Sequence, residues 1–332
     1  MFKNLLVYRL ADEWSATVAQ IEESLAKSPF AECGATQARS AGWVSPRGVD
    51  HGRLVESVAG HWLMMLMVEQ KVVPGAVVKR QVDALAARIE KDTGRKPGRK
   101  QQRELKDQAL LDLLPMAFTK RASLRVWIAP DDRLLVIDSA SSARADEVLT
   151  ALSEAIPGLS ARLVNTAVSP AAAMSDWLLS GEPPAGFTVD RDCELKAADG
   201  EKPVVRYARH ALDIAEVREH ITAGKQATRL ALTWQGRVSL VLTDGLQLRR
   251  LSFLDGVFEK SAGASKDEAF DADAAIATGE LLPLIADLLD ALGGEQALGA
   301  QAAVAAPAAA APPAPAATKP GTELPPWEQA AV

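Results

Sequence analysis

Residues that could act on a substrate are few in this chain, and their spacing brings none of them together. The acidic candidates are the pairs Asp131-Asp132, Asp190/Asp192 and Asp271/Asp273, the last followed by Glu280. A metal-dependent nuclease needs carboxylates that converge on ions about 4 Å apart, and no motif here predicts that convergence. The first pair is typical of a turn, and the others lie in polar connections or at a helix start. We therefore predict no catalytic residues, no metal site and no cofactor, and expect the chain not to be an enzyme.

The histidines and cysteines lead to the same expectation. No His is spaced from another His or Cys as a metal ligand would be; the four are His51, His61, His210 and His220. Cys33 and Cys193 are far apart and form no Cys-x-x-Cys motif, which argues against a zinc ribbon, an iron–sulfur site and a disulfide scaffold. The chain also lacks the Gly-x-Ser-x-Gly motif of a nucleophile elbow.

These features, with the hydropathy of the chain, predict a cytoplasmic protein without a membrane segment. Two unpaired cysteines fit a reducing compartment. The residues that follow Met1 have neither the long apolar core nor the cleavage site of a signal peptide. The longest apolar run, Trp62–Val68, is far too short to cross a bilayer.

Charge gives a stronger signal than catalytic chemistry. The segment Lys91–Arg125 carries ten Lys and Arg against four Asp and Glu, whereas the whole chain of 332 residues has a net charge of −6. One basic segment on an acidic body predicts a surface for a polyanion, with nucleic acid as the first candidate. The alternative is a solvated, salt-bridged helix face. Gly94–Lys100 is not a phosphate-binding loop, because no Ser or Thr follows the Lys and no strand precedes the glycine.

The composition also indicates how nucleic acid would be bound. Aromatic residues make up only 5% of the chain and do not alternate with the basic residues, as a stacking platform for single strands requires. Contact through phosphates remains, which is salt-sensitive and independent of sequence. We therefore expect double-stranded DNA as the main partner, with weaker binding of single strands. Two alternatives stay open, namely a metal-dependent nuclease and an adaptor module whose basic segment meets an acidic protein partner.

Hydrophobic periodicity indicates the elements that position the basic segment. Val78, Val82, Leu85 and Ile89 recur at helical spacing, and Gly94 with Pro97-Gly98 ends that helix. A second helix is predicted from about Lys100 to Leu114. The basic residues therefore lie at the tip of a helical excursion.

The remaining pattern predicts an α+β fold with mixed, mainly antiparallel sheets and helices. Strands are expected at 2–10, 62–68, 124–128 and 134–138, and an antiparallel meander at 228–234, 237–243 and 247–253. Helices are expected at 15–25, 145–156, 214–222 and 278–292, with another that begins at Pro170. Residues 181–202 are expected to be irregular.

Four parts are predicted along the chain. Residues 1–75 and 119–165 form a central α+β domain, 76–118 a helical tip and 166–298 a base α+β domain. Residues 299–332 are rich in Ala and Pro and are expected to be a disordered tail. The tail contains Trp327 in the stretch LPPWE, which is either a docking peptide for a protein partner or a remnant without function.

Several spaced motifs resemble one known family. They are MFKNLLVYRL at 1–10, Cys33-Gly34, Gly42-Trp43-Val44, LLPMAF at 113–118, Ala223-Gly224-Lys225, LALTW at 230–234 and TGEL at 278–281. In these motifs, which follow in order over residues 1–298, the sequence resembles the recombination-associated protein RdgC family of bacteria. The resemblance implies a non-enzymatic protein that binds DNA without sequence preference and prefers the duplex. It also implies a ring-forming homodimer with a positively charged hole, association with the nucleoid, and restraint of the recombinase RecA.

The resemblance also assigns roles to individual residues. Phe118 matches an aromatic residue of a gate between the two tips, although it would otherwise be the last apolar residue of a helix. Arg209 and His210 match a basic and polar pair at the base-side contact between subunits. A family Arg is replaced by Met116, and Lys120 and Arg121 are candidates to compensate. The candidate DNA contacts are Arg95, Lys96, Arg99, Lys100, Lys120, Arg121 and Arg209.

Overall fold

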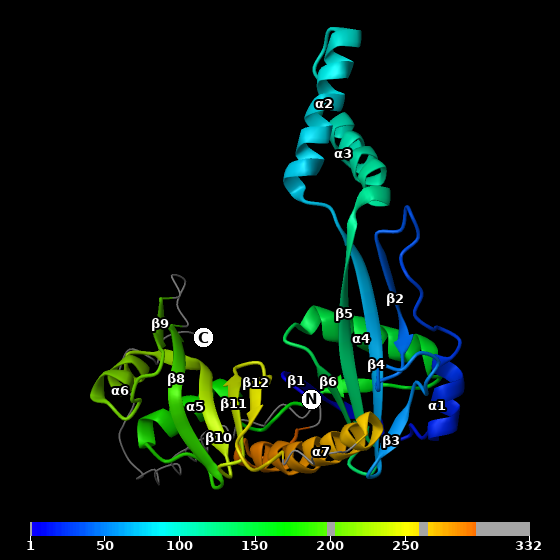
Figure 1. Cartoon of the computed structure of the whole chain (residues 1–332). Helices are drawn as coiled ribbons and strands as arrows, with labels where there is room; N and C mark the ends of the chain where they lie inside the picture. Colours follow the sequence, from blue (N-terminus) through cyan, green and yellow to red (C-terminus); the bar gives the residue numbers. More distant parts are fainter. Residues whose placement is uncertain (1, 198–202, 259–264, 297–332) are drawn as a thin grey trace, which may run out of the picture. The chain divides into compact units, whose positions relative to one another are not determined.

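One antiparallel sheet runs through the described part of the chain, which comprises residues 2–197, 203–258 and 265–296 of a computed structural model (Figure 1). Its strands follow the order β2-β4-β5-β6-β1-β12-β11-β10-β8-β9, with β3 paired to β4 and β7 to β1. The strands are β1 (Leu5–Leu10), β2 (Arg39–Val44), β3 (Glu56–Val58), β4 (His61–Val72), β5 (Phe118–Ala129), β6 (Leu134–Asp138), β7 (Ala161–Leu163), β8 (Phe187–Ala197), β9 (Val204–Tyr207), β10 (Lys225–Trp234), β11 (Val238–Thr243) and β12 (Leu248–Phe253).

The helices belong to three groups. The first covers one face of the central strands and comprises α1 (Val18–Leu25) and α4 (Ser142–Ala155). The second packs on the opposite face and comprises α5 (Pro170–Ser180), α6 (Ala215–Thr222) and α7 (Lys266–Ala291). The third is a hairpin of α2 (Gly75–Thr93) and α3 (Arg99–Leu113), closed by the 3-10 turn η1 (Leu114–Met116).

The central strands are buried on both faces. Along β1, Leu5 and Val7 belong to the core beneath α5, α6 and α7, whereas Leu6 and Tyr8 belong to the core beneath α1 and α4. The same alternation divides the residues of β5 and β6 between the two cores. Both faces are apolar, so these strands read as continuous hydrophobic runs in the sequence.

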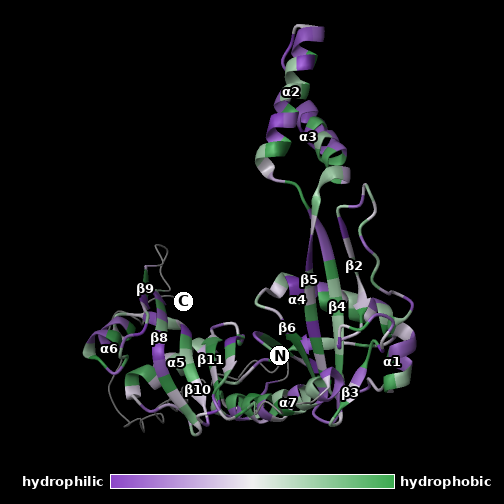
Figure 2. Ribbon diagram, in the orientation of Figure 1, coloured by the Kyte–Doolittle hydropathy of each residue, from purple (hydrophilic) through white to green (hydrophobic). Residues whose placement is uncertain are grey.

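The strands β8 to β12 differ, because the helices of the described residues cover only one of their faces. Leu230, Leu232 and Trp234 of β10 alternate into the core with α5, α6 and α7, and Ala231 between them lines a cleft together with Asp190, Arg191 and Asp192 of β8. Figure 2 shows the contrast in hydropathy between the strands and helices of the cores and the hydrophilic far end of the α2–α3 hairpin. The open face of β8 to β12 is therefore available for polar and charged side chains.

The α2–α3 hairpin is inserted between the ends of the two longest strands. β4 and β5 pair in continuous register from Trp62↔Ile128 to Val72↔Phe118, and α2 begins three residues after β4 ends (Figure 1). The ladder thus carries the basic segment away from both cores.

Comparison with the sequence pattern confirms the α+β class, the antiparallel sheet and the meander of β10, β11 and β12. Two expectations were wrong. Residues 187–197 form β8 where irregular structure was expected, and α7 begins at Lys266, well before the expected start at Thr278. Residues 1–296 form one compact unit, within which the central, tip and base parts remain a proposal. The expected tail and Trp327 lie outside the described residues.

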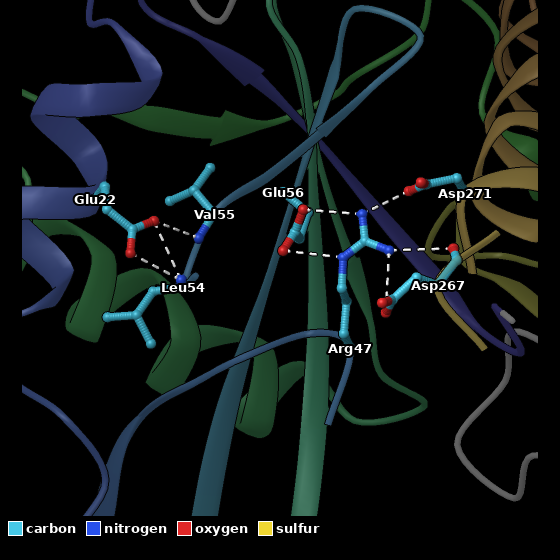
Figure 3. A network of polar contacts seen from close by, with 7 residues as sticks. All are labelled: Glu22, Arg47, Leu54, Val55, Glu56, Asp267 and Asp271. Atoms are coloured by element: carbon cyan, nitrogen blue, oxygen red, sulfur yellow. Dashed lines mark hydrogen bonds and ion pairs between the residues drawn. The ribbon is translucent and has the colours of Figure 1, made fainter. Parts of the chain in front are cut away.

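A cluster of charges around Arg47 joins the central strands to α7 (Figure 3). Arg47 lies between β2 and β3, and its Nε and Nη2 reach the two oxygens of Glu56 at 3.0 Å. Nη2 also donates to Asp271 Oδ1 at 2.6 Å, and Nη1 donates to the carbonyl of Asp267 at 3.1 Å. The guanidinium lies 4.7 Å from the ring centroid of Phe270. Its planar shape lets one side chain bind β3 and the first turns of α7 together.

A second contact in Figure 3 fastens the same region to α1. The carboxylate of Glu22 accepts hydrogen bonds from the backbone N–H groups of Leu54 and Val55, at 2.8 to 3.1 Å. These two residues immediately precede β3. The stretch from Arg47 to β3 is thus bound on one side by α1 and on the other by α7.

Replacing Arg47 with Ala should lower the free energy of unfolding by about 3 kcal/mol, because it leaves the carboxylate of Glu56 buried without its partner. The side chains of Arg47 and Glu56 are only 17% and 12% exposed. Urea denaturation followed by circular dichroism measures the change. The matched control is Arg218→Ala on the exposed surface of α6, which should stay within about 0.5 kcal/mol. Equal stability of the two variants would contradict the role of Arg47.

Candidate nucleic-acid interface

The turn between α2 and α3 exposes a compact group of cations. Gly94 ends α2 in the left-handed conformation with φ of 69°, and Gly98 is the N-cap of α3. Between them Pro97 is buried, whereas Arg95 and Lys96 are exposed. The buried proline and the two glycines fix the turn, so that the charged side chains project into solvent.

The first turn of α3 adds to this positive end. Arg99 and Lys100 begin the helix, and that turn contains no acidic residue. Acidic side chains are favoured at this position, because the helix dipole and the unpaired N–H groups are positive there. Cations in their place make an end that attracts phosphate. The structure therefore brings Arg95, Lys96, Arg99 and Lys100 together, and their role as DNA contacts remains a proposal.

Lys120 and Arg121 do not extend this group, because they occupy opposite faces of β5. Lys120 lines a small cleft on the α4 side together with Arg39 and Arg144. Arg121 lies on the other face, where it forms ion pairs with Glu32 and with Glu69. Neighbouring residues in a strand point to opposite sides, so the adjacent pair in the sequence is not a pair in space.

Glu69 gives Arg121 a structural role. Its side chain is 2% exposed and accepts hydrogen bonds from the Cys33 backbone N–H at 2.6 Å and from Arg121 Nε at 2.7 Å. The bond from Cys33, followed by the bond from Arg121, lowers the pKa of the Glu69 carboxyl below its ordinary value. Lys71 Nζ adds hydrogen bonds to the carbonyls of Gly34 and Ala35. Together these contacts fasten the loop at 33–35 to β4 and β5.

Arg209 and His210 are exposed at the chain segment that follows β9. Arg209 has a left-handed backbone with φ of 56°, and its N–H donates to Asp192 Oδ1 at 2.7 Å. The N–H of His210 donates to the carbonyl of Arg191 at 3.0 Å, and its ring lies 5.9 Å from that of Tyr207. β8 therefore fixes the backbone of both residues while their side chains face solvent. The base-side contact assigned to them remains a proposal.

A second group of cations, which the sequence did not predict, lies on the open face of the sheet. Arg206, Arg229, Arg249 and Arg250 line one cleft of about 250 Å³. Asp192 and Glu194 line it as well, so the cations are in excess. Four arginines, contributed by β9, β10 and β12, thus converge at one place on the face that helices leave uncovered.

A β-bulge in β12 directs two of these arginines to the cleft. The register passes from Ser239↔Ser252 to Val241↔Arg249, so β12 contains one more residue than β11 at this point. Arg250 lies at the bulge with φ of 52°. Arg249 and Arg250 therefore both line the cleft, although they are consecutive. The sequence contains a signal for this arrangement, because the two core residues Leu248 and Leu251 are three positions apart instead of two.

Glu194 orients two of the arginines. Its carboxylate accepts a hydrogen bond from Arg206 Nε at 2.6 Å and one from Thr228 Oγ1 at 2.9 Å, and it lies 3.7 Å from Arg229 Nη1. Burial alone would raise the pKa of Glu194, but the hydrogen bonds from Arg206 and Thr228 outweigh it and hold that pKa below the ordinary value. The carboxylate is therefore ionised at neutral pH and holds both guanidinium groups at the cleft.

Phe118 is not part of the core. It is the first residue of β5, opposite Val72 of β4, and its side chain is 88% exposed. Val72, Leu111 and Met116 are also exposed near this end of the ladder. Phe118 therefore lies at the start of a strand and not in a helix, and its role in a contact between subunits remains a proposal. Large exposed apolar side chains that gather at one place are typical of an interface.

Among residues 2–197, 203–258 and 265–296, no group of three or more His, Cys, Asp or Glu side chains is placed to hold a metal ion. Within the same ranges no helix has both the length and the hydropathy needed to span a bilayer.

Comparison with known proteins identifies the relatives of the chain. A family model described as "Putative exonuclease, RdgC" matches residues 1–295. The chain belongs to the RdgC family. The recombination-associated protein RdgC of Cupriavidus pinatubonensis is 46% identical over 297 residues, which cover 89% of this chain and 99% of that protein. The proteins of the same name from Dechloromonas aromatica and Herminiimonas arsenicoxydans are 44% and 43% identical, over 89% of this chain and 98% and 99% of theirs.

Several of the motifs that suggested the RdgC family have a structural explanation. Gly42 is needed because a Cβ there would lie 2.4 Å from the Phe30 backbone. Cys33 donates to the buried Glu69, and Thr278 is buried in α7. Residues 113–118 form the passage from α3 into β5. The fold therefore explains the residue types at these positions.

Replacing Glu69 with Gln should lower the thermal midpoint at pH 7, and this effect should shrink as the pH is lowered from 7 to values below the ordinary Glu pKa. The folded-state pKa of Glu69 is lowered, so its contribution is fully present above the ordinary Glu pKa and is lost as the pH falls through the folded-state value. Thermal melts of both proteins across this range measure the difference. Glu23→Gln, at an exposed carboxylate, should change the midpoint little throughout. A Glu69→Gln effect that is constant with pH would contradict the role of the charge.

Proposed function

We propose that the chain binds double-stranded DNA through phosphate contacts, without reading the base sequence and without acting as an enzyme. Membership of a family whose relatives are named recombination-associated proteins supports a role on DNA. The observation that carries the proposal is the pair of cationic surfaces on a chain of net charge −6. One is the α2–α3 turn, and the other is the arginine cleft on the open face of β8 to β12.

The side chains at both surfaces favour contact with the DNA phosphates over recognition of the bases. Arginine and lysine side chains dominate them, and phosphate contacts position a duplex without distinguishing sequences. Guanidinium groups suit phosphate oxygens because they can donate two parallel hydrogen bonds. Lys120 and Arg209 are further phosphate contacts in this proposal, whereas Arg121 has its structural partners Glu32 and Glu69.

The proposed binding unit is a homodimer that closes into a ring around the duplex. A twofold dimer places the same patch of each subunit against its copy. The exposed Phe118 is the proposed contact at the hairpin, and Arg209 with His210 the proposed contact at the base side. Two separate contacts on one chain are what a closed ring requires, and both sites are exposed.

Occupation of duplex DNA by such rings would restrain recombination by RecA, because the recombinase filament and the ring would compete for the same DNA. Under this proposal the protein acts in the cytoplasm, in association with the nucleoid. Single-stranded DNA would bind more weakly, since neither surface offers a row of aromatic side chains for stacking. The proposal needs no cofactor.

Duplex affinity should fall steeply with salt, and each cationic surface should contribute to the slope. Arg95→Ala/Lys96→Ala at the turn and Arg249→Ala/Arg250→Ala at the cleft should each weaken binding about three- to tenfold. Each should also reduce the slope of log K against log salt by about one for every phosphate that is no longer neutralised. Electrophoretic shifts at graded salt, with random-sequence duplexes, give both quantities. Arg218→Ala is the control and should leave the slope unchanged.

Binding by the unaltered chain that is absent or independent of salt would contradict the proposal. The exonuclease in the description of the family model is tested in the same samples. Linear DNA should stay intact during long incubation with Mg²⁺ or Mn²⁺, and its degradation would favour the metal-dependent nuclease instead.

Replacing Phe118 with Ala should weaken the dimer about tenfold or more without destabilising the subunit. Aromatic anchors dominate the energy of interfaces, whereas an 88% exposed side chain contributes little to folding. Sedimentation velocity gives the dimer dissociation constant, and a thermal melt gives the stability. The matched control is Val49→Ala, at another exposed apolar residue. Loss of stability in parallel with dimerisation would show that Phe118 belongs to the fold of the subunit.

A further inference from the structure

The two ends of the sheet differ in how their outer strands are covered. β2 forms one end, and residues 28–31 lie along its outer side. Trp43 of β2 exchanges backbone hydrogen bonds there with Ser28 and Phe30, at 3.0 and 3.1 Å. β9 forms the other end (Figure 1), and among the described residues no strand pairs with its outer side. An edge strand of this kind is a template for pairing with another strand.

The register of β8 and β9 shows which backbone groups of β9 point outward. The N–H of Ala197 donates to the carbonyl of Pro203 at 3.1 Å, and β9 continues along β8 in the same register. Hydrogen-bonded and non-hydrogen-bonded pairs alternate in an antiparallel ladder. Counted from this bonded pair, the N–H and C=O of Val205 face β8, whereas those of Val204 and Arg206 point away from the sheet.

We propose that β9 pairs antiparallel with β9 of a second copy of the chain, about a twofold axis at Val205. Val204 of each strand would lie opposite Arg206 of the partner subunit, and these residues would exchange backbone hydrogen bonds. This inference rests on the proposed homodimer and gives its base-side contact a definite structure. Arg209 and His210, to which that contact was assigned, follow β9 directly in the chain and are exposed.

The side chains of β9 favour a second copy in this register. Arg206 is the one charged residue of β9, and Glu194 of β8 already pairs with it at 2.6 Å. In the proposed register Arg206 faces Val204, which is 44% exposed and would become covered. A shift by two residues would place Arg206 opposite its own copy, and like charges directly opposite are unfavourable. Val205 would lie beside its own copy on the axis, where pairs of β-branched residues are favourable.

Pairing of the two β9 strands would join the open faces of two subunits into one surface. Arg206 of β9 lines the arginine cleft, so the clefts of the two subunits would lie on either side of the twofold axis. Phosphate contacts act together along a duplex. The joined surface would therefore offer a duplex more cations in one place than either subunit does alone.

A disulfide across the axis tests the register. Val205→Cys should form a covalent dimer on oxidation, because the Cα atoms of a non-hydrogen-bonded pair lie about 4.5 Å apart, which suits a disulfide. Val204→Cys is the matched control, since its two copies would lie about 8 Å apart, which is too far. Non-reducing gel electrophoresis should show a yield at least about fivefold higher for Val205→Cys. The unaltered chain, with Cys33 and Cys193, gives the background. Equal yields from the two variants, or a Val205→Cys yield at background, would overturn the proposal.

Proline at the edge tests the backbone hydrogen bonds. Val204→Pro removes an N–H that points away from β8, so the subunit should keep its fold. The substitution removes one bond on each side of the axis and should weaken dimerisation about tenfold. Val204→Thr keeps the N–H and the strand preference, so it should change dimerisation less than about threefold. Sedimentation velocity gives the dissociation constants, and thermal melts compare the stabilities. Equal weakening by Pro and Thr would contradict pairing through the backbone.

The sedimentation of the unaltered chain separates failure of this inference from failure of the proposed function. If the unaltered chain is a dimer and Val205→Cys does not cross-link, the pairing of β9 is wrong and the proposed homodimer stands. If the unaltered chain is a monomer, the pairing and the homodimer are both overturned. Binding of duplex DNA at graded salt is measured independently of either result.

Discussion

The fold depends on one constraint, namely that a single antiparallel sheet is covered on both faces along half of its width and on one face along the other half. β1, β5 and β6 lie between two cores, with α1 and α4 on one side and α5, α6 and α7 on the other. From β12 to β8 the second layer of helices is missing among the described residues. Strands that are buried on both sides must be apolar throughout, whereas strands with an open face can alternate with charged residues. The arginine cleft exists because of that missing layer.

The buried carboxylates decide what each cation can do. Arg47 and Arg121 are bound by Glu56 and Glu69, whose side chains are 12% and 2% exposed. A charge at such a position must keep its partner, because an unpaired buried carboxylate costs several kcal/mol. These two arginines therefore hold segments of the chain together. The cations at the α2–α3 turn lie beyond both cores, so no such demand limits their use for a ligand. Burial of the paired carboxylate, rather than charge density along the sequence, therefore distinguishes the structural arginines from the cations that are available to a ligand.

Much of the architecture could be predicted from the sequence, because β10, β11 and β12 alternate with period two, α2 ends before Gly94 and α3 begins after Gly98. β8 escaped prediction since Asp190, Arg191 and Asp192 interrupt the alternation where its pairing with β10 is irregular. The early turns of α7 escaped because Asp and Ala there read as a polar connection. The open-face arginines come from different strands and meet only through the sheet order, which no local pattern reveals. Phe118 was proposed from the resemblance to the RdgC family, and the turn cations were proposed because they lie within one continuous basic segment.

The net negative charge of the chain confines the attraction of a polyanion to the two cationic surfaces. A chain of net charge −6 repels a polyanion in general, so attraction is confined to the places where cations exceed carboxylates. At the cleft, Asp192 and Glu194 lie among four arginines, and Glu194 both orients two of them and offsets part of their charge. Affinity for a phosphate backbone rises with the number of phosphates that are neutralised, so this partial compensation would limit the strength of the proposed binding at the cleft. Under the proposed function, a protein that must occupy any duplex and later release it gains from such moderation, because retention would come from the closed ring and not from tight local contacts.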